Sequence, residues 1–531
     1  MPVPEQLVRR MTTDVIVVGA GSNSLATACY LAKAGMSVAV LERNAVAGGG
    51  VVSVEIAPGF VHDTHAMGYM TCLANPIVRH DELELGKRFG LRWAYTHSPF
   101  ASIFDDGTGL ISYRDIDKTI AAVGQFSARD AVAYAQLVEE AFELLPVLTT
   151  AFYAPPMPAA GFNKLLASSE KGRGIAAAMG GSVLDFLNAR FESPHVKSHF
   201  AKWAGEMMTG PDAPGTGLAM YMLLGLSHTF EMGTVVGGSK NLTRALVDCL
   251  HHHGGRLELN RTVDSLIVES GRCVGVRLED GQEMRARKAV VANIHPWDLG
   301  QMVPGVPADV AARARAVKLS EFGALNQQIA LTEAPRWKMG DEFLEPTLVE
   351  CLSADWQSFI KPFEDFRNNV MPLDHLGPLV NVQSNIDPTR APDGQAAMYL
   401  YQFAPFDVEG GWEAMKEEAA DAVFDWCASF TTNLDRSKLM ARLIESPADQ
   451  DRHSRIMRKG DIMGIAMTSD QLLGARPTPE LSNYRVPGVE GLYLAGCTTH
   501  PGGTVTLGGR ATAIRMFDDF DIPLSVGFTH W

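Results

Sequence analysis

Four positions near the start of the chain have the types and spacing needed to bind a dinucleotide. Gly19 and Gly21 directly follow an apolar run, and Glu42 stands 23 residues after Gly19. Gly19 allows a tight turn from a strand into a helix, and Gly21 lets the backbone approach a pyrophosphate closely. The amides at the helix start then bind the anion, and Glu42 accepts hydrogen bonds from an adenosine ribose. Ser24 occupies the third position of the pattern, where glycine is usual, so we expect a small shift of the helix.

These side chains must be positioned by a β-α-β unit. Residues 15–18 form a β-branched apolar run, which is typical of a strand buried on both faces. Residues 25–35 indicate a helix of small residues that ends at Gly35, and residues 37–41 indicate a second strand. Because strand, helix, second strand and acid fall in register, the sequence predicts a dinucleotide site rather than a coincidental glycine turn.

A glycine cluster follows the acid and distinguishes between cofactors. Arg43 comes directly after Glu42. A cluster of three glycines, Gly48, Gly49 and Gly50, begins six residues after Glu42. A turn of this kind lets backbone amides reach a second part of an extended dinucleotide. The stretch resembles the E-R-x-x-x-x-G-G continuation of FAD-binding oxidoreductases of the amine oxidase and phytoene desaturase type. The resemblance implies FAD as the cofactor, with Arg43, Gly49 and Gly50 among its binding residues.

A second glycine-rich stretch lies close to the carboxyl end of the chain. Residues 492–495 form an apolar strand, Gly496 is the turn that follows it, and residues 502–503 are glycines that can pass under a flat ring. We expect a helix from about Thr506, with its N-terminus aimed at the pyrimidine end of a flavin. The dipole of that helix would stabilise negative charge on the reduced ring.

This stretch carries the most specific resemblance in the chain. Residues 491–503 resemble the G-L-Y-x-x-G-x-x-T-H-P-G-G signature of phytoene desaturases and carotenoid isomerases. The likeness is strongest to a branch described as phytoene-dehydrogenase-related or pyridine nucleotide-disulphide oxidoreductase-like. In the resembling flavoproteins, the residue matching Val263 supplies backbone contacts to adenine. The chain has no arginine just after its glycine cluster, where related amine oxidases carry one, which disfavours an amine oxidase.

The resemblance implies an α/β fold with a discontinuous Rossmann-type FAD-binding domain and a mixed α+β substrate cap. We assign residues 12–75, 230–300 and 481–531 to the FAD-binding domain, and residues 76–229 and 301–480 to the cap. Within the cap, the spacing of apolar residues predicts one helix that starts near Ser127 and ends at Pro146, and another over 182–190. Residues 300–480 show no legible pattern.

The family chemistry is a hydride exchange between a flavin and a hydrophobic substrate of isoprenoid, carotenoid or alicyclic type. A neighbouring group must then move a proton. His500, beside the expected flavin turn, is one candidate, and a structural role in the turn is its alternative. His65, Tyr69 and Glu206 are the other candidates. His62 and His65 have no third ligand near them in the sequence, so we expect no metal site.

Composition narrows the cellular setting. The 531 residues carry a net charge of −15, which argues against nucleic acid as a partner. Seven scattered cysteines indicate a reducing compartment, and no stretch has the roughly 20 apolar residues of a membrane span. We expect residues 1–11 to be a short disordered leader and the protein to be cytoplasmic. A peripheral membrane contact, a homo-oligomer, and oxygen or a quinone as electron acceptor are all left open.

Four functional hypotheses are compatible with these patterns. The first is a desaturase or dehydrogenase that acts on carbon–carbon bonds, and the second is an isomerase or saturase that acts on similar substrates. The third is an amine oxidase, and the fourth is a flavin-binding protein of low turnover that acts through partners. Five methionines between residues 207 and 232 indicate either an adaptable substrate pocket or a loosely packed core.

Overall fold

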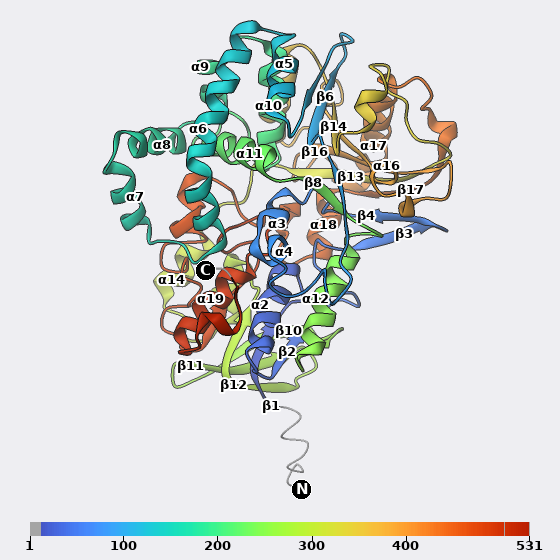
Figure 1. The fold of residues 1–531 in the computed structure, drawn as a ribbon. Coiled ribbons are helices and arrows are strands. Elements are labelled where there is room, and N and C mark those ends of the chain that lie inside the picture. Colours follow the sequence, from blue (N-terminus) through green and yellow to red (C-terminus); the bar gives the residue numbers. More distant parts are fainter. Residues whose placement is uncertain (1–11, 504, 530–531) are drawn as a thin grey trace.

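The computed structural model describes residues 12–503 and 505–529, and the leader expected at residues 1–11 lies outside this part. Two seven-stranded sheets organise the described chain. In Figure 1 the first sheet lies in the lower half, near the N-terminal end, and the second lies in the upper half. The strands of the two sheets fall in the ranges expected for the FAD-binding domain and the cap, respectively, and we propose the division into domains on this basis.

The first sheet has the strand order β10-β11-β12-β1-β2-β9, and β18 pairs with β12. Strands β1, β2, β9, β12 and β18 are linked by parallel pairings. Their bounds are β1 (Thr12–Val18), β2 (Val38–Leu41), β9 (Arg256–Glu258), β10 (Val263–Glu269), β11 (Arg272–Leu278), β12 (Glu283–Ala292) and β18 (Leu492–Leu494). The glycine turn at the end of β1 therefore lies at the carboxyl edge of a parallel sheet, where ligands bind in open α/β folds.

Three helices cover one face of this sheet: α2 (Ser22–Lys33), α12 (Lys240–His252) and α19 (Gly509–Asp519). The expected β-α-β unit is confirmed, although α2 starts three residues before the predicted Leu25. Helix α19 begins at Gly509 rather than near Thr506. A Cβ atom on Gly509 would lie 1.8 Å from the carbonyl oxygen of Asn23, so this close helix contact requires glycine.

The second sheet has the order β17-β13-β16-β15-β14-β6-β7. Its strands are β6 (Phe100–Phe104), β7 (Gly109–Ser112), β13 (Gly323–Leu331), β14 (Leu348–Leu352), β15 (Leu379–Val382), β16 (Ala396–Ala404) and β17 (Leu439–Glu445). Strand β13 is buried along its whole length and includes Asn326, Gln327 and Gln328. Each of the three amides donates to a backbone carbonyl, from Thr64 or Ala420. Three consecutive buried amides break the apolar pattern that marks a central strand.

Helices cover the second sheet: α5 (Ile116–Gly124), α6 (Ala128–Tyr153), α9 (Val183–Arg190), α10 (Pro194–Gly205), α11 (Leu218–Thr229), α15 (Trp356–Arg367) and α17 (Trp412–Ser429). The other helices are α3 (Met70–Ala74), α4 (Pro76–Arg79), α7 (Ala159–Ala167), α8 (Glu170–Gly180), α13 (Leu299–Met302), α14 (Ala308–Arg315), α16 (Gln383–Ile386) and α18 (Pro447–His453). None of these described helices combines the length and apolarity that crossing a bilayer requires.

Helix α6 corrects one prediction and confirms another. Its start is confirmed, because the Ser127 hydroxyl accepts a hydrogen bond from the amide of Asp130 at 3.1 Å. The predicted end at Pro146 is wrong, since the helix continues to Tyr153. Pro146 lies on the exposed side, where water can replace the missing N–H group. The Thr149 and Thr150 hydroxyls bond backbone carbonyls of the turn that contains the proline.

Two antiparallel pairs complete the strands: β3 (Ser53–Ala57) with β4 (Phe60–Asp63), and β5 (Trp93–Thr96) with β8 (Met232–Val235). The turn between β3 and β4 lies at Pro58 and Gly59, where Gly59 adopts a φ of 83°. Strands β5 to β7 were missed, because the spacing of apolar residues within 76–229 predicted only helices.

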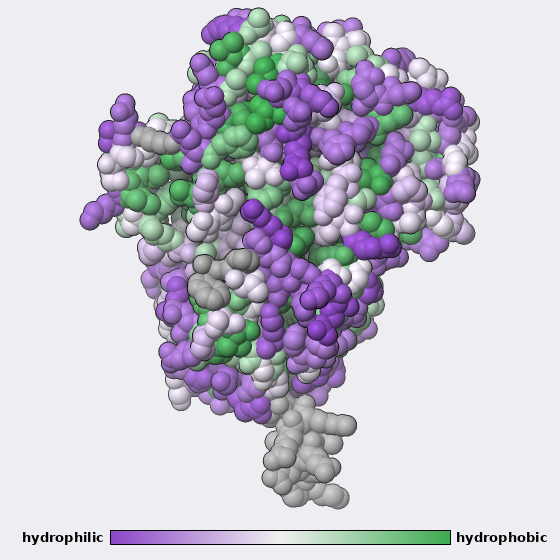
Figure 2. Space-filling model, in the orientation of Figure 1, coloured by the Kyte–Doolittle hydropathy of each residue, from purple (hydrophilic) through white to green (hydrophobic). Residues whose placement is uncertain are grey.

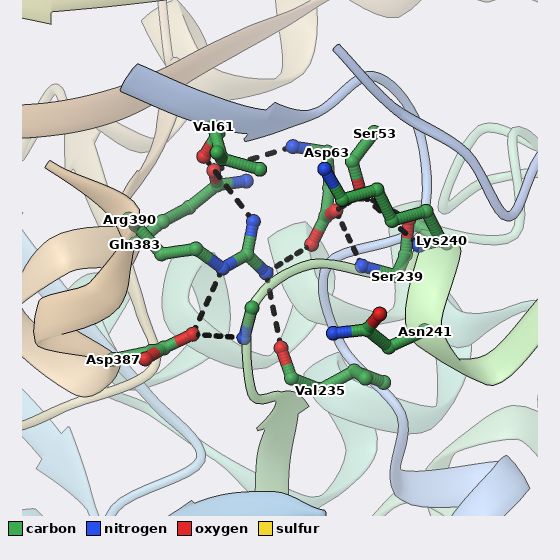
Figure 3. A network of polar contacts seen from close by, with 12 residues as sticks. Ser53, Val61, Asp63, Val235, Ser239, Lys240, Asn241, Gln383, Asp387 and Arg390 are labelled. Carbon is green, nitrogen blue, oxygen red and sulfur yellow. Dashed lines mark hydrogen bonds and ion pairs between the residues drawn. The ribbon is translucent and has the colours of Figure 1, made fainter. Parts of the chain in front are cut away.

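A buried arginine connects the hairpin to the cap (Figure 3). The Arg390 side chain is fully buried; its Nη2 lies 2.6 Å from Oδ2 of Asp63, and its Nε lies 3.0 Å from Oδ2 of Asp387. It also donates to the carbonyls of Val61 and Val235. Arg390 thus holds together β4, the end of β8 and the segment that follows α16.

Backbone amides complete the coordination of both carboxylates. Oδ1 of Asp63 accepts from the amide of Ser239 at 2.7 Å and from the hydroxyl of Ser53 at 2.6 Å. Oδ2 of Asp387 also accepts from the amide of Gly237 at 2.6 Å. A buried ion pair whose remaining bonds are satisfied is stable only while all partners are present, because removal of one leaves a buried charge.

We therefore predict that Arg390→Met lowers the free energy of unfolding by about 3–5 kcal/mol, since it leaves Asp63 and Asp387 buried without a counter-charge. Urea titration measures the change. The matched control is Arg129→Met, which removes the ion pair of Arg129 with Glu192, whose side chains are 65% and 51% exposed; it should cost no more than about 1 kcal/mol. Equal losses for the two variants would contradict this account of the joint.

Candidate cofactor and substrate cavity

A cavity of about 970 Å³ is lined by residues of both sheets. Val18 of β1 and Gly496 after β18 border it from the first sheet, and Tyr401 of β16 and Glu445 of β17 border it from the second. Pockets of this size at the carboxyl edge of a parallel sheet commonly bind cofactors and small molecules.

The end of the cavity nearest β1 is walled by backbone rather than by side chains. Gly19 adopts a φ of 88°, and Gly21 caps α2 without a side-chain hydrogen bond to its first amides. The amide of Gly48 donates to the carbonyl of Ala20 at 2.8 Å, and a Cβ atom on Gly49 would lie 3.2 Å from Cα of Gly21. The two glycine turns thus contact each other and leave helix-terminal amides available to an anion.

Glu42 lies at the end of β2 beside this turn. Its Oε2 accepts from the amide of Ala20 at 2.8 Å, and its Oε1 accepts from the amide of Asn44 at 2.9 Å. Each carboxylate oxygen keeps a second acceptor position, which is what a ribose hydroxyl requires. Arg43 and Val263 border the same cavity. The Arg43 guanidinium donates to two backbone carbonyls at the end of α18, so it also fastens the cofactor loop to the cap.

Asn293, the residue after β12, was missed by the sequence analysis. Its amide lies between the two glycine-rich turns: a Cβ atom on Gly19 would lie 3.4 Å from Cβ of Asn293, and one on Gly496 would lie 2.1 Å from its Oδ1. Oδ1 is buried and has no hydrogen-bond partner among the described residues. A buried acceptor without a donor is costly, so a ligand hydroxyl or amide fits this position. Gly50, the last of the first glycine cluster, also borders the cavity.

These features fit an extended dinucleotide. The uncapped helix start suits a diphosphate, Glu42 and Asn293 supply acceptors for hydroxyl groups, and Val263 borders the cavity where adenine contacts were expected. The residues present therefore fit the FAD that the sequence implied.

Two of the four candidates for the proton-moving group border the cavity, and two do not. His65 and Glu206 belong to its lining. Burial lowers the pKa of His65 to about 4, so the ring is neutral at neutral pH, and its Nδ1 has no partner among the described residues. Tyr69 is fully buried outside the lining, where its hydroxyl donates to the carbonyl of Ala66.

His500 also lies outside the cavity lining. Its Nε2 bonds the carbonyl of Ala151 at 2.8 Å, and burial lowers its pKa to about 4. The ring thereby fastens the end of α6 to the carboxyl-terminal turn, and these contacts support the structural alternative. Ser24 and Thr506 are likewise buried outside the lining. The backbone carbonyl of Thr506 accepts a hydrogen bond from the side-chain amide of Asn75 at 2.8 Å.

Glu445 borders the cavity and was missed, because only the topology of β17 brings it there. The residue is 6% exposed, and Oε2 of its carboxyl group has no partner among the described residues. Burial, together with the charge of Asp449, raises the pKa of Glu445 to about 7. Nε2 of His453 lies 3.5 Å from its other oxygen. A carboxyl group with such a pKa can take up or release a proton near neutral pH.

Arg476 places a buried positive charge beneath the carboxyl-terminal turn. It is fully buried, and its Nη2 donates to the carbonyl of Cys497, a lining residue, at 2.7 Å. Its other bonds are to carbonyls as well, and its Nε has no partner among the described residues. Burial raises the pKa of Cys497 to about 11, which keeps this residue a neutral thiol.

The five methionines divide between the two alternatives. Met207 and Met232 border the cavity, Met208 and Met220 are fully buried in the core beneath it, and Met222 is half-buried against that core. The stretch is therefore part pocket wall and part packed core.

Comparison with known proteins gives the same assignment. A family model described as flavin containing amine oxidoreductase matches residues 25–424. The mouse protein named pyridine nucleotide-disulfide oxidoreductase domain-containing protein 2 is 30% identical, over 95% of this chain and 93% of its own length. A phytoene desaturase (lycopene-forming) from Pseudescherichia vulneris is 24% identical, over 95% of this chain and 99% of its own length.

A solved structure agrees at the level of the fold. The crystal structure of an oxidoreductase from Methanosarcina mazei has a TM-score of 0.62 at 15% identity, and the match covers 96% of this chain and 100% of that one. Together with the family model, these similarities confirm the resemblance inferred from the sequence. They also confirm the Rossmann-type FAD-binding fold, with FAD as the cofactor.

The turns at residues 19–21 and 48–50, together called the glycine cradle, can be tested as a cofactor site without disturbing the fold. A Cβ atom on Gly21 would meet only Nδ2 of Asn293, at 3.8 Å, but it would stand where a diphosphate must approach. Gly21→Ala should therefore weaken FAD binding by about tenfold or more, equivalent to about 1.4 kcal/mol, with little change in the thermal stability of the apoprotein. Calorimetric titration with FAD measures the affinity. Gly174→Ala in α8, with nothing within 4 Å of its Cβ, is the control; unaltered affinity for Gly21→Ala would contradict the assignment.

Proposed function

We propose that this chain, a member of the flavin-containing amine oxidoreductase family and an FAD-dependent oxidoreductase, removes hydrogen from a carbon–carbon bond of a hydrophobic, isoprenoid-like or alicyclic substrate. The observation that carries the proposal is the continuity of one cavity between the glycine cradle and an apolar cap wall. That wall is formed by Trp203, Met207, Leu223, Met232, Leu348 and Leu379.

FAD supplies the hydride acceptor of this reaction when it is bound. The protein holds the dinucleotide through the turns at residues 19–21 and 48–50, and its apolar wall orients the substrate and excludes water. Arg476 donates a hydrogen bond to the carbonyl of Cys497. Its positive charge favours negative charge at the carboxyl-terminal turn and so supports the reduced state of the cofactor.

Glu445 is the proton acceptor that best fits this reaction, because it combines a pKa near neutrality with an unpartnered oxygen at the cavity. His65 is the second candidate, because it borders the same space. Its pKa is lowered to about 4, so the ring is neutral at neutral pH. If bound FAD accepts the hydride from one carbon, such a base would take up the proton released from the neighbouring carbon.

The other hypotheses make different demands on the same cavity. An amine oxidase would bind its amine in an aromatic cage, and the described cavity lining contains no Phe, Tyr or Trp other than Trp203 and Tyr401. An isomerase would need reduced flavin without a net oxidation of the substrate, whereas a saturase would reduce its substrate at the expense of reduced flavin.

Anaerobic titration of the purified holoenzyme with alkenes, alicyclic compounds and amines tests the proposal. Loss of flavin absorbance with an alkene or alicyclic compound is the expected result. Reduction by amines alone would assign an amine oxidase and overturn the proposal. A flavin that dithionite reduces but none of these compounds do would favour the isomerase or the binding protein.

The protonation of Glu445 predicts a pH dependence. Its folded-state pKa of about 7 lies above the usual value of 4.5 for a glutamate, so the carboxylate that accepts a proton is present above about pH 7 and lost below it. The rate of anaerobic flavin reduction should rise through this pH. Glu445→Gln should lower that rate by about 10²–10⁴-fold and abolish the inflection. Glu418→Gln, an exposed residue of α17, is the control; a Glu445→Gln profile like that of the wild type would exclude this role.

We further propose a cytoplasmic protein that contacts membranes peripherally and passes electrons to oxygen or a quinone. Val147, Met157 and Leu165, on or next to α6 and α7, are 57%, 50% and 51% exposed. Figure 2 shows hydrophobic surface around the α7–α8 projection. We expect the protein to co-sediment with vesicles of neutral phospholipid. The double variant Met157→Gln, Leu165→Gln should remain in the supernatant. No sedimentation of the wild type would refute the contact.

Reoxidation of the reduced protein by oxygen or by a short-chain quinone identifies the acceptor.

A further inference from the structure

A charged pair is buried at the apolar end of the cavity. The Lys202 side chain is 2% exposed, and its Nζ donates to Oε1 of Glu206 at 3.0 Å. Lys202 is in the last turn of α10 and Glu206 directly follows that helix, and Nζ also lies 3.5 Å from the ring centre of Phe403. Glu206 borders the cavity, and its side chain is 26% exposed, so the lysine fixes a carboxylate that remains open to a ligand.

The surroundings make this carboxylate unusual. Trp203, Met207, Leu223 and Met232 border the cavity around it, and none of them offers a charge. A buried ion pair in apolar surroundings is costly unless further hydrogen bonds satisfy its remaining lone pairs. A pure hydrocarbon in this space would displace water from Glu206 and replace none of its hydrogen bonds.

The charge balance of the cluster narrows the class of ligand. Glu350, beside the pair, is 1% exposed and accepts from the Ser102 hydroxyl at 2.9 Å. Burial raises the pKa of Glu350 to about 8, so its carboxyl group is neutral at neutral pH. Lys202 and Glu206 then cancel each other, and an ammonium ligand would add an unbalanced positive charge next to Lys202. A hydroxyl group satisfies the carboxylate and adds no charge.

Tyr401 is the other polar group at this end. Its ring borders the cavity, and burial together with the charge of Glu206 holds the pKa of its phenol well above the usual value. The phenol therefore keeps its proton and adds no charge to the cluster. It forms a second polar contact surface beside Glu206.

We propose that Glu206, fixed by Lys202, is a recognition site for a hydroxyl group on an otherwise apolar substrate. The inference rests on the proposed function, because it names the substrate class of the same cavity as an alicyclic or isoprenoid alcohol. Glu206 accepts a hydrogen bond from the substrate and thereby sets which carbon atoms face the cofactor. It is a binding and positioning residue, and the proton acceptor is Glu445.

Calorimetric binding to the FAD-loaded, full-length protein tests the site independently of turnover. The probes are limonene, its hydroxylated counterpart carveol, and the amine of the same skeleton. A hydrogen bond to a charged acceptor predicts that carveol binds about tenfold or more tighter than limonene. Glu206→Leu should abolish this preference without weakening the binding of limonene. Glu206→Gln keeps the shape and an uncharged acceptor, so it should reduce the preference by about threefold or more. Glu139→Gln, on the exposed face of α6, is the control.

Equal affinity for carveol and limonene, or no saturable binding of carveol, would overturn the hydroxyl site. Tighter binding of the amine would overturn it in favour of an ammonium site. If limonene reduces the flavin and binds as tightly as carveol, the proposed function stands and this inference fails. If carveol binds preferentially but no compound reduces the flavin, the site stands and the proposed function fails.

Discussion

The geometry of the cavity depends on one buried guanidinium. Arg390 binds Asp63 on the hairpin β3–β4 and Asp387 of the cap, and both carboxylates also accept from amides that lead into α12. The hairpin is further fixed because Nε2 of His62 bonds the carbonyl of Ile329 at 3.0 Å. Since one wall of the cavity comes from each sheet, this joint helps to set the relative position of the two walls. Charge burial is tolerated here because it is fully coordinated.

The cavity changes in chemical character along its length. Next to β1 it consists of glycine backbone and helix-terminal amides, which suit anions and hydroxyl groups. In the cap it consists of apolar side chains, among which only a few ionisable groups are placed. Low polarity around those groups shifts their pKa values by desolvation, which keeps His65 neutral and brings Glu445 close to neutrality. The burial of the cavity lining thus sets the protonation of both groups.

The sequence predicted the parts of the fold that depend on local geometry. Gly19 and Gly21 specify a turn that few other residues can adopt, so the β-α-β unit and a dinucleotide site could be inferred from spacing, whereas FAD was implied by the family resemblance of the residues that follow Glu42. Strand β13 could not, because Asn326, Gln327 and Gln328 are satisfied by carbonyls far away in the chain. Pro146 does not end α6, because its missing N–H group faces the exposed side. His500 lies outside the cavity lining and Glu445 lies within it, because only the packing of distant elements decides which side chain faces the cavity.

A crystal structure of the protein with bound FAD is the most direct test of the central claim that one cavity holds both cofactor and substrate. The account predicts the diphosphate against residues 19–21 and 48–50, Asn293 within hydrogen-bond distance of the cofactor, and the ring system beside Cys497. It also predicts that Glu206 and Glu445 border the space left in front of the ring. A cofactor bound elsewhere, or a ring system separated from the apolar wall by protein, would contradict it.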